Sequence, residues 1–199
     1  DGKQEGKSYI VKKLVTDQLW SQHLAGEGPS LGIIPIMADN TSRWGCIDID
    51  QYPLDLAALV VKIKKLKLPL VSCRSKSGGA HCFAFTKDPV PAGEMQDYLT
   101  GCAALLGESG REIFPKQREI LVSRGDTGNF LNLPYHHVDR TLRYAIKEDG
   151  SAASIEEFFE IYEANVQEKL TLPKPSKKEK GPVFDGPPCL QALCTQGFP

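Results

Sequence analysis

The chain has 199 residues and a formal net charge of −1 at pH 7, which excludes a protein covered in basic residues. A locally basic groove would still suffice to bind a phosphate backbone, so the charge does not exclude a nucleic-acid partner. Hydrophobic residues make up 41% of the sequence and charged residues 25%, as in an ordinary globular domain with one buried core.

The cysteines argue against a structural zinc domain, and the hydropathy argues against a membrane-spanning protein. No pair of the six cysteines has the Cys-x-x-Cys spacing of a zinc site, so we expect no structural zinc. Cys46, Cys73 and Cys82 lie in apolar runs, where a reduced thiol behaves as a small buried hydrophobe. No apolar stretch approaches the length of a membrane span, and reduced thiols indicate a cytoplasmic protein.

One helix and two strands are predicted in the first part of the chain. Thr16 can cap a helix over 17–25, which Gly26 would end. Apolar runs then predict strands over 31–37 and 44–50.

The middle of the chain predicts a helix, a β-hairpin and a second helix. Apolar residues recur at helical spacing over 53–66, and a proline at the first of these positions suits a helix start. Runs over 70–76 and 80–87 flank a Ser-Gly-Gly turn and predict a hairpin. A helical pattern over 91–106 follows.

Short strands and a last helix complete the pattern. The strands are expected over 112–115, 120–123, 129–133 and 143–146, and Ser154 can cap an acidic helix over 155–166. This order of elements favours an α+β fold with a mainly antiparallel sheet over a doubly wound parallel sheet.

The composition also predicts how the chain divides. We expect one domain over residues 1–170. Residues 171–188, which are proline-rich and carry a Ser-Lys-Lys-Glu-Lys run, have the composition of a linker. Residues 189–199 show a helical pattern, and we interpret them as the truncated start of a helical C-terminal domain.

Asp48 and Asp50 are two residues apart in the run Trp44-Gly-Cys-Ile-Asp-Ile-Asp50. Side chains alternate along an extended chain, so both carboxylates project from one face of the strand. Two like charges this close are unfavourable unless a divalent cation lies between them. The pair therefore predicts the metal-holding edge of a nucleotidyl-transfer site.

The hairpin Arg74-Ser-Lys-Ser-Gly-Gly-Ala-His81 is the second candidate segment. Gly78 and Gly79 permit positive φ, so backbone N–H groups can turn toward one concavity and hold an anion. The side chains that would add donors are Arg74, Ser75, Lys76 and Ser77. Because Asp50 ends one predicted strand and His81 begins another, antiparallel pairing would bring them to one edge of a sheet. The alternative is a tight turn that needs its glycines for geometry alone.

A third acid is expected, since two closely spaced metal ions need more ligands than two carboxylates supply. Glu112 is the candidate, because it begins a predicted strand and shares a face with Phe114. Asp126 and Glu119 are its competitors, and an ordinary surface acid is the alternative for Glu112 itself.

Polar side chains beyond this acid could hydrogen-bond a base, a sugar or a strand backbone. They are Lys116, Gln117, Asn129 and Asn132. The alternative is turn chemistry, since asparagine and glycine are common beside strands.

Together these residues resemble the three signature motifs of the archaeo-eukaryotic primase superfamily. The motifs are Asp48-x-Asp50, Ser77-Gly-Gly-Ala-His81, and Glu112 before Phe-Pro-Lys-Gln117. Their order and spacing are similar to the primase-polymerase branch of phages, plasmids and bacterial conflict systems. The resemblance covers about Leu31 to Pro134. Gly79 departs from it, because many members carry serine there, and the zinc module of several relatives is absent.

The resemblance implies an RRM-like antiparallel sheet as the catalytic half, packed with a smaller α/β half. It implies that Asp48, Asp50 and Glu112 hold two Mg²⁺ or Mn²⁺ ions. His81, with Ser75, Lys76 and the glycines, would grip the β and γ phosphates of a nucleotide. Such enzymes are nucleotidyltransferases of the cytoplasm of a bacterial or virus-infected cell.

The partners implied are single-stranded DNA, a primer strand, and ribo- or deoxynucleoside triphosphates. A fused C-terminal helical or helicase domain is also expected. A metal-dependent nuclease is the second hypothesis, since clustered acids near a basic residue suit it. A catalytically inactive RRM-like binding module is the third, although Asp48 and Asp50 would repel a bound strand unless neutralised.

Overall fold

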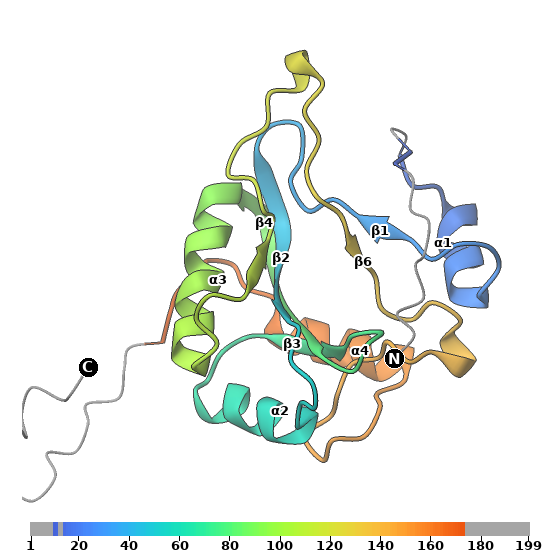
Figure 1. Cartoon of the computed structure of the whole chain (residues 1–199), viewed down its shortest axis with the longest axis vertical. Coiled ribbons are helices and arrows are strands. Elements are labelled where there is room, and N and C mark those ends of the chain that lie inside the picture. The colour runs from blue at the N-terminus through green and yellow to red at the C-terminus, as the bar shows by residue number, and fades with distance from the viewer. Residues whose placement is uncertain (1–9, 12–13, 174–199) are drawn as a thin grey trace, which may run out of the picture.

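The computed structural model describes residues 10–11 and 14–173. Its centre is a four-stranded sheet in which every pair of neighbouring strands is antiparallel. The strands are β2 (Thr41–Ile49), β3 (Val71–Arg74), β4 (Ala80–Pro91) and β5 (Glu112–Phe114), in the spatial order β3-β4-β2-β5 (Figure 1).

Two crossover helices give this sheet its topology. Helix α2 (Leu56–Lys65) joins β2 to β3, and α3 (Ala92–Leu106) joins β4 to β5. Each connection passes over one intervening strand, which is the β-α-β-β-α-β arrangement of RRM-like sheets. The predicted α+β fold with an antiparallel, RRM-like half is therefore confirmed.

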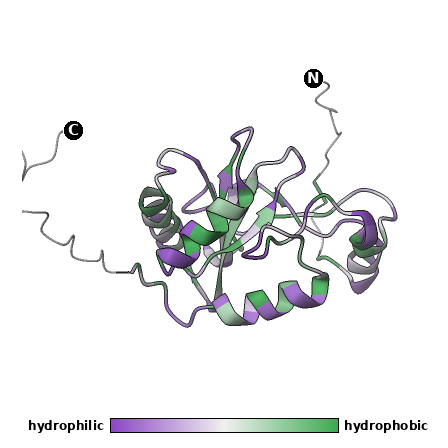
Figure 2. Cartoon of the chain, turned by 90° about the horizontal axis from the view of Figure 1, so that it is seen from below, coloured by the Kyte–Doolittle hydropathy of each residue, from purple (hydrophilic) through white to green (hydrophobic). Residues whose placement is uncertain are grey.

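Both crossover helices cover the same face of the sheet. Helix α2 begins after Asp55, whose carboxylate accepts a hydrogen bond from the backbone N–H of Ala58 (2.9 Å). Helix α3 ends at Gly107, which takes the left-handed conformation (φ +72°). Hydrophobic and hydrophilic residues alternate along the helices, as expected where one side packs on a sheet (Figure 2). The buried contacts include Ile47, Ile49, Cys82, Ile63, Met95 and Leu99.

A smaller half covers the opposite face of the sheet. It consists of α1 (Asp17–Ala25), the two-stranded sheet of β1 (Gly32–Ile33) and β6 (Leu131–Asn132), and α4 (Ile155–Asn165) (Figure 1). The core between the halves contains Cys46, Val71, Phe83, Phe114, Leu131 and Tyr135. Because side chains alternate along β2, Ile47 and Ile49 face the crossover helices while Cys46 and Asp48 face the smaller half.

Four predicted strands are wrong in extent or kind, and the one expected over 129–133 is reduced to the two residues of β6. The strand expected over 31–37 is reduced to β1, because Pro35 has no N–H to donate and Ile36 is buried in a small core instead. Residues 120–123 form no strand; a 3₁₀ turn (Val122–Arg124) lies there. Residues 143–146 form only two isolated bridges, from Ala145 to Cys73 of β3 and from Ile146 to Ala152. Outside the short β1–β6 ladder, buried apolar side chains or a few backbone hydrogen bonds hold these segments.

The described chain ends close to the sheet's helical face. Leu170 is buried in that core, and Leu172 lies against Gly101 of α3. Almost all of the predicted linker (171–188), and all of the predicted helical start (189–199), lie outside the described residues. Among the helices that are described, none has the length and apolar character needed to cross a membrane.

The cysteines of the sheet follow the prediction of burial. Cys46, Cys73 and Cys82 are fully buried, and so is Cys102 of α3. None of these four thiols forms a disulfide. Burial raises the pKa of the Cys46, Cys73 and Cys82 thiols, so they are unreactive packing residues.

Candidate active site on the central sheet

Three of the predicted site residues lie in one row across the sheet. Asp48 of β2 is in register with His81 of β4 on one side and with Glu112 of β5 on the other. Residues directly opposite each other in antiparallel strands share a face and have Cα atoms roughly 4.5–5.5 Å apart. The sheet thus brings together, within side-chain reach, residues that are far apart in the sequence.

Asp48 is held in an environment that disfavours its negative charge. Its side chain is only 15% exposed, and its Oδ1 atom has no hydrogen-bond partner among the described residues. Burial, followed by the charges of Asp50 and Glu112, raises the pKa of Asp48 to about 6. An unpartnered, buried carboxylate oxygen between two other acids is a fitting ligand for a divalent cation.

His81 is neutral at pH 7. Burial is the main cause that lowers the pKa of its imidazole to about 4; the charge of Asp50 opposes this shift, and that of Arg143 adds to it. The 3.5 Å separation between His81 Nε2 and Asp48 Oδ1 is therefore not an ion pair. The ring lies edge-on to Phe83, with centroids 6.0 Å apart. A neutral imidazole keeps one N–H donor and one acceptor, which suits contact with a phosphate.

Asp50 comes directly after β2, and its carboxylate is exposed at the edge of the row. The hydroxyl of Tyr52 donates a hydrogen bond of 2.7 Å to Asp50 Oδ1. Burial and this bond raise the pKa of Tyr52, while Ser77 of the hairpin opposes the rise. Tyr52 is therefore close both to Asp50 and to Ser77 of the glycine turn. Sequence reasoning missed it, although a tyrosine two residues after the second aspartate was a usable signal.

The glycine hairpin is seated on the end of β2. Ser75 N–H donates to the carbonyl of Gly79 (2.9 Å), and Gly78, with φ +96°, donates to the carbonyl of Ser75 (3.1 Å). A Cβ on Gly79 would lie 2.3 Å from the carbonyl oxygen of Ile49. Only glycine allows this contact, which explains the absence of serine. The hairpin is thereby fixed next to the backbone that carries Asp48 and Asp50.

The hairpin side chains differ in their exposure and in their hydrogen-bond partners. Ser75 is buried, and within the described part of the chain its Oγ has no hydrogen-bond partner, so it is free to receive a ligand. Lys76 and Ser77 are exposed at the turn. Arg74 instead donates to the carbonyl of Leu142 (3.0 Å), so its guanidinium braces the neighbouring loop.

Arg143, one of several basic residues in the middle of the sequence, lies near the row. It precedes the bridge between Ala145 and Cys73, which extends the sheet beyond β3. Its guanidinium is near enough to His81 to lower the pKa of that residue, and it donates to the carbonyl of Leu133 (3.3 Å). Sixty-two positions separate Arg143 from His81, so spacing carried no signal for this contact.

Glu112 has its backbone in the predicted place but its carboxylate elsewhere. The side chain is 60% exposed and forms an ion pair with Lys116, with Nζ 2.9 Å from Oε2. Consistent with this, residues 10–11 and 14–173 contain no three His, Cys, Asp or Glu side chains that already surround a common point. A rotation of the Glu112 side chain is needed to close a metal site around Asp48.

The remaining predicted contacts are not brought to the row. Gln117 and Asn129 hydrogen-bond to each other and clip together the two arms of the loop between β5 and β6. Asn132 lies in β6, in the other sheet. Asp126, a competitor of Glu112, caps the backbone N–H of Leu121 at the tip of that loop (3.0 Å), and Glu119 is exposed in the same loop.

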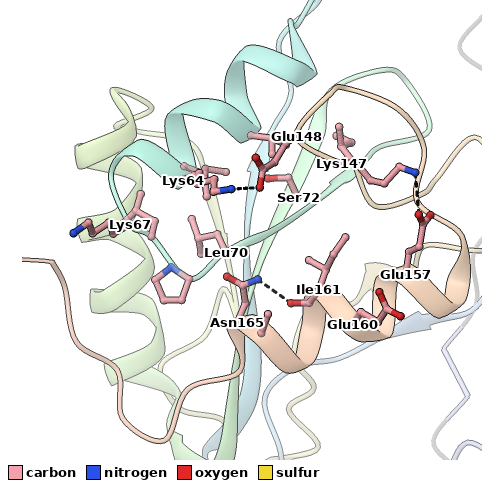
Figure 3. A pocket seen from close by; sticks show the side chains of 16 residues that line it. Lys64, Lys67, Leu70, Ser72, Lys147, Glu148, Glu157, Glu160, Ile161 and Asn165 are labelled. Carbon is pink, nitrogen blue, oxygen red and sulfur yellow. Dashed lines mark hydrogen bonds and ion pairs between the residues drawn. The ribbon is translucent and has the colours of Figure 1, made fainter.

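Two grooves mark the surface. One of about 320 Å³ lies beside Glu112, between α3 and the segment after β5. Another of about 630 Å³ lies between α2 and α4, and its rim carries the ion pairs Lys64–Glu148 and Lys147–Glu157 (Figure 3). None of the residues of the row lines the larger groove.

An RRM-like sheet with acids on a central strand, facing a smaller α/β half, is the arrangement expected of an archaeo-eukaryotic primase. Residues 4–168 match the family described as the archaeo-eukaryotic primase domain of the TOTE conflict system, and the chain belongs to this family. The predicted membership of the conflict-system branch is thereby confirmed. The family is one of primase-polymerase-like nucleotidyl transfer, with nucleic acid and nucleotides as substrates and divalent metals as usual cofactors. No curated protein matches the chain.

Proposed function

We propose that this chain is the catalytic core of a template-dependent DNA primase-polymerase. It would transfer nucleotides from ribo- or deoxynucleoside triphosphates to a 3′ hydroxyl on single-stranded DNA, and so make or extend primers. The observation that carries the proposal is the in-register row of Asp48, His81 and Glu112, with a buried Asp48 oxygen that no described residue satisfies.

Asp48, Asp50 and Glu112 would hold two Mg²⁺ or Mn²⁺ ions. When bound, the ions supply the positive charge that favours the attacking hydroxylate and steadies the leaving pyrophosphate. The chain's own contribution is placement: Asp48 offers an oxygen with no competing donor, and Asp50 is oriented by Tyr52. Glu112 would join them by rotating away from Lys116.

The triphosphate would lie against the hairpin, on the other side of Asp48 from Glu112. Ser75 has a free hydroxyl there, and the neutral His81 has an N–H to donate. Arg143 adds a positive charge, and Lys76 at the exposed turn adds another. These donors would bind the β and γ phosphates and aim the α phosphate at the row of acids.

Partners beyond the substrates are part of the same proposal. A template strand and a primer strand would approach from the open side of the row, in the cytoplasm of a bacterial or virus-infected cell. The fused helical or helicase domain expected after residue 188 stays a prediction.

The experiment that tests the function supplies single-stranded DNA, Mn²⁺ and labelled nucleotides. We expect labelled products from the wild-type chain and a loss of at least about 1,000-fold in Asp50→Asn, because one metal ligand is removed. Unchanged synthesis in that variant would overturn the assignment. Breakdown of the DNA in the absence of any nucleotide would favour a nuclease instead.

Tyr52→Phe tests the orienting role of its hydroxyl. Loss of the hydrogen bond to Asp50 should weaken Mn²⁺ binding about three- to tenfold, because outer partners of metal ligands fix their direction. Electron paramagnetic resonance of free Mn²⁺ measures this directly. Tyr144→Phe is the matched control, and equal affinities in the two variants would contradict the role.

A further inference from the structure

Glu112, the proposed third metal ligand, is paired with Lys116 in this structure. Lys116 Nζ lies 2.9 Å from Glu112 Oε2 and 5.1 Å from the centroid of the Phe114 ring. The same charge is close enough to Asp48 to oppose the rise in its pKa. The ammonium group thus partly neutralises the acids of the row, as a bound metal ion would do.

Glu112 has two alternative partners. Its backbone is opposite Asp48, so its carboxylate can turn toward the row; it can also remain on Lys116, which follows four positions later. Because the carboxylate has to turn from Lys116 to reach the row, it cannot keep its present contact with the ammonium group. Turning toward the row would leave the Lys116 ammonium without its counter-ion.

The groove beside Glu112 determines what a released Lys116 would meet. Arg118 in this groove is bound to Asp97 through two hydrogen bonds of 2.6 and 2.8 Å. The amide of Gln96 is held by the carbonyls of Pro115 and Lys116, at 2.8 Å each. Release of Lys116 would therefore give this groove one net positive charge. It lies on the β5 side of Asp48, away from the hairpin, where a strand backbone rather than the triphosphate would pass.

We propose that Lys116 is an exchangeable counter-ion: it neutralises Glu112 while the metal site is empty, and passes to a backbone phosphate of single-stranded DNA when Glu112 turns to the metal. The proposal rests on the metal site proposed above. It makes metal and DNA bind cooperatively, because each removes the competitor of the other, and such coupling is reciprocal.

The strength of a half-exposed ion pair sets the size of the effect. Exposed pairs contribute little, so Mn²⁺ should tighten DNA binding by about two- to fivefold. Fluorescence anisotropy of a labelled single-stranded oligonucleotide, with and without Mn²⁺ and with no nucleotide present, measures the ratio in the absence of turnover. The ratio should fall to about one in Lys116→Gln. It should persist in the charge-matched control Lys64→Gln, whose ion pair with Glu148 lies in the other groove.

Glu112→Gln provides the opposite test. It should release Lys116 permanently, so that the metal-free variant binds the oligonucleotide about as tightly as the wild type with Mn²⁺. Glu119→Gln is the control: it removes an equal charge from the same segment and should increase the affinity for the oligonucleotide less. The gain should vanish in the double variant Glu112→Gln/Lys116→Gln, since no cation is left to release.

Two results would overturn the proposal. One is a wild-type Mn²⁺ ratio in Lys116→Gln; the other is a loss of nucleoside triphosphate binding in this variant with the DNA ratio intact, which would assign Lys116 to the nucleotide. All readouts are binding measurements on the folded variants. Failure here with synthesis still dependent on Asp50 would remove only this proposal, whereas synthesis independent of Asp50 would remove the function.

Discussion

Replacing Asp48 by Asn is expected to abolish nucleotide incorporation and, at the same time, to stabilise the metal-free protein above pH 6. Synthesis should fall at least about 1,000-fold, because the central ligand of the row is lost. The free energy of unfolding at pH 8 should rise by about 1–2 kcal/mol, since a rise in the pKa of Asp48 to about 6 is at most about 3 kcal/mol of unfavourable charge burial. Function and stability thus oppose each other at this residue.

The pH dependence of the gain has a definite sign. A carboxyl whose pKa is higher in the folded than in the unfolded state keeps its proton longer when folded. The contribution of Asp48 to the free energy of unfolding therefore falls as pH rises from 3.8 to about 6, and stays lower above that. Asp48→Asn removes this decrease in stability. The variant should therefore have a higher free energy of unfolding than the wild type at pH 8, and a similar one at pH 4.

The pKa of His81 is lowered on folding, so its effect on stability has the opposite dependence on pH. Its folded pKa of about 4 lies below the ordinary value of 6.5, so its contribution to stability is present above pH 6.5 and is lost as pH falls toward 4. This loss affects the wild type and Asp48→Asn alike and cancels in their difference.

Chemical denaturation at pH 4 and pH 8, without metal, measures the gain. The exposed Asp88→Asn is the matched control and should change neither stability nor synthesis appreciably. Mn²⁺ should raise the melting temperature of the wild type at pH 8 and leave that of Asp48→Asn almost unchanged. An Asp48→Asn protein no more stable than wild type at pH 8 would show that this carboxylate is not held at an unfavourable position.

Gly79→Ala should have the second large effect, because it forces apart the hairpin and the strand that carries the acids. The added Cβ would lie 2.3 Å from the carbonyl oxygen of Ile49 and 3.3 Å from Ser75 Oγ. The closest contact is with the backbone of Ile49, which cannot move aside as the end of a flexible side chain could. We expect a loss of about 2–4 kcal/mol in the free energy of unfolding, or a displaced hairpin with about 100-fold slower synthesis.

Gly78→Ala is the matched control for this variant. Gly78 is the preceding residue of the same turn and has φ +96°, but the nearest atom to an added Cβ is Arg74 Nη2, at 3.5 Å. Its replacement should cost about 1 kcal/mol for the backbone conformation alone. Denaturation curves and synthesis rates at saturating nucleotide compare the two, and a Gly79→Ala protein that matches Gly78→Ala in both would contradict the contact.

Much of the site could be predicted because its signals are local. Alternation along one strand places Asp48 and Asp50 on one face, whatever the rest of the chain does. The glycine pair determines a turn, and the strand after it begins at Ala80, one residue before His81. Local pattern also predicted both crossover helices, because apolar residues recur at helical spacing within each segment.

The errors occurred where long-range contacts outweighed local pattern. Ile36 resembles a strand residue in its run, yet it is buried against Ala92 and Ile120 from distant segments. Gln117 and Asn129 look like ligand donors, but they satisfy each other across a loop. Local sequence contains no information on which polar groups will meet, because the meeting depends on how the loop closes.

The sequence by itself determined the chemistry on offer: two acids on one face, a third acid at the start of another strand, and a glycine turn followed by a histidine. Only the tertiary structure decided the register that sets Asp48 between His81 and Glu112, and the partners that Tyr52 and Lys116 provide. The reason is physical: alternation is a property of each strand alone, whereas register follows from packing the whole sheet between its two cores.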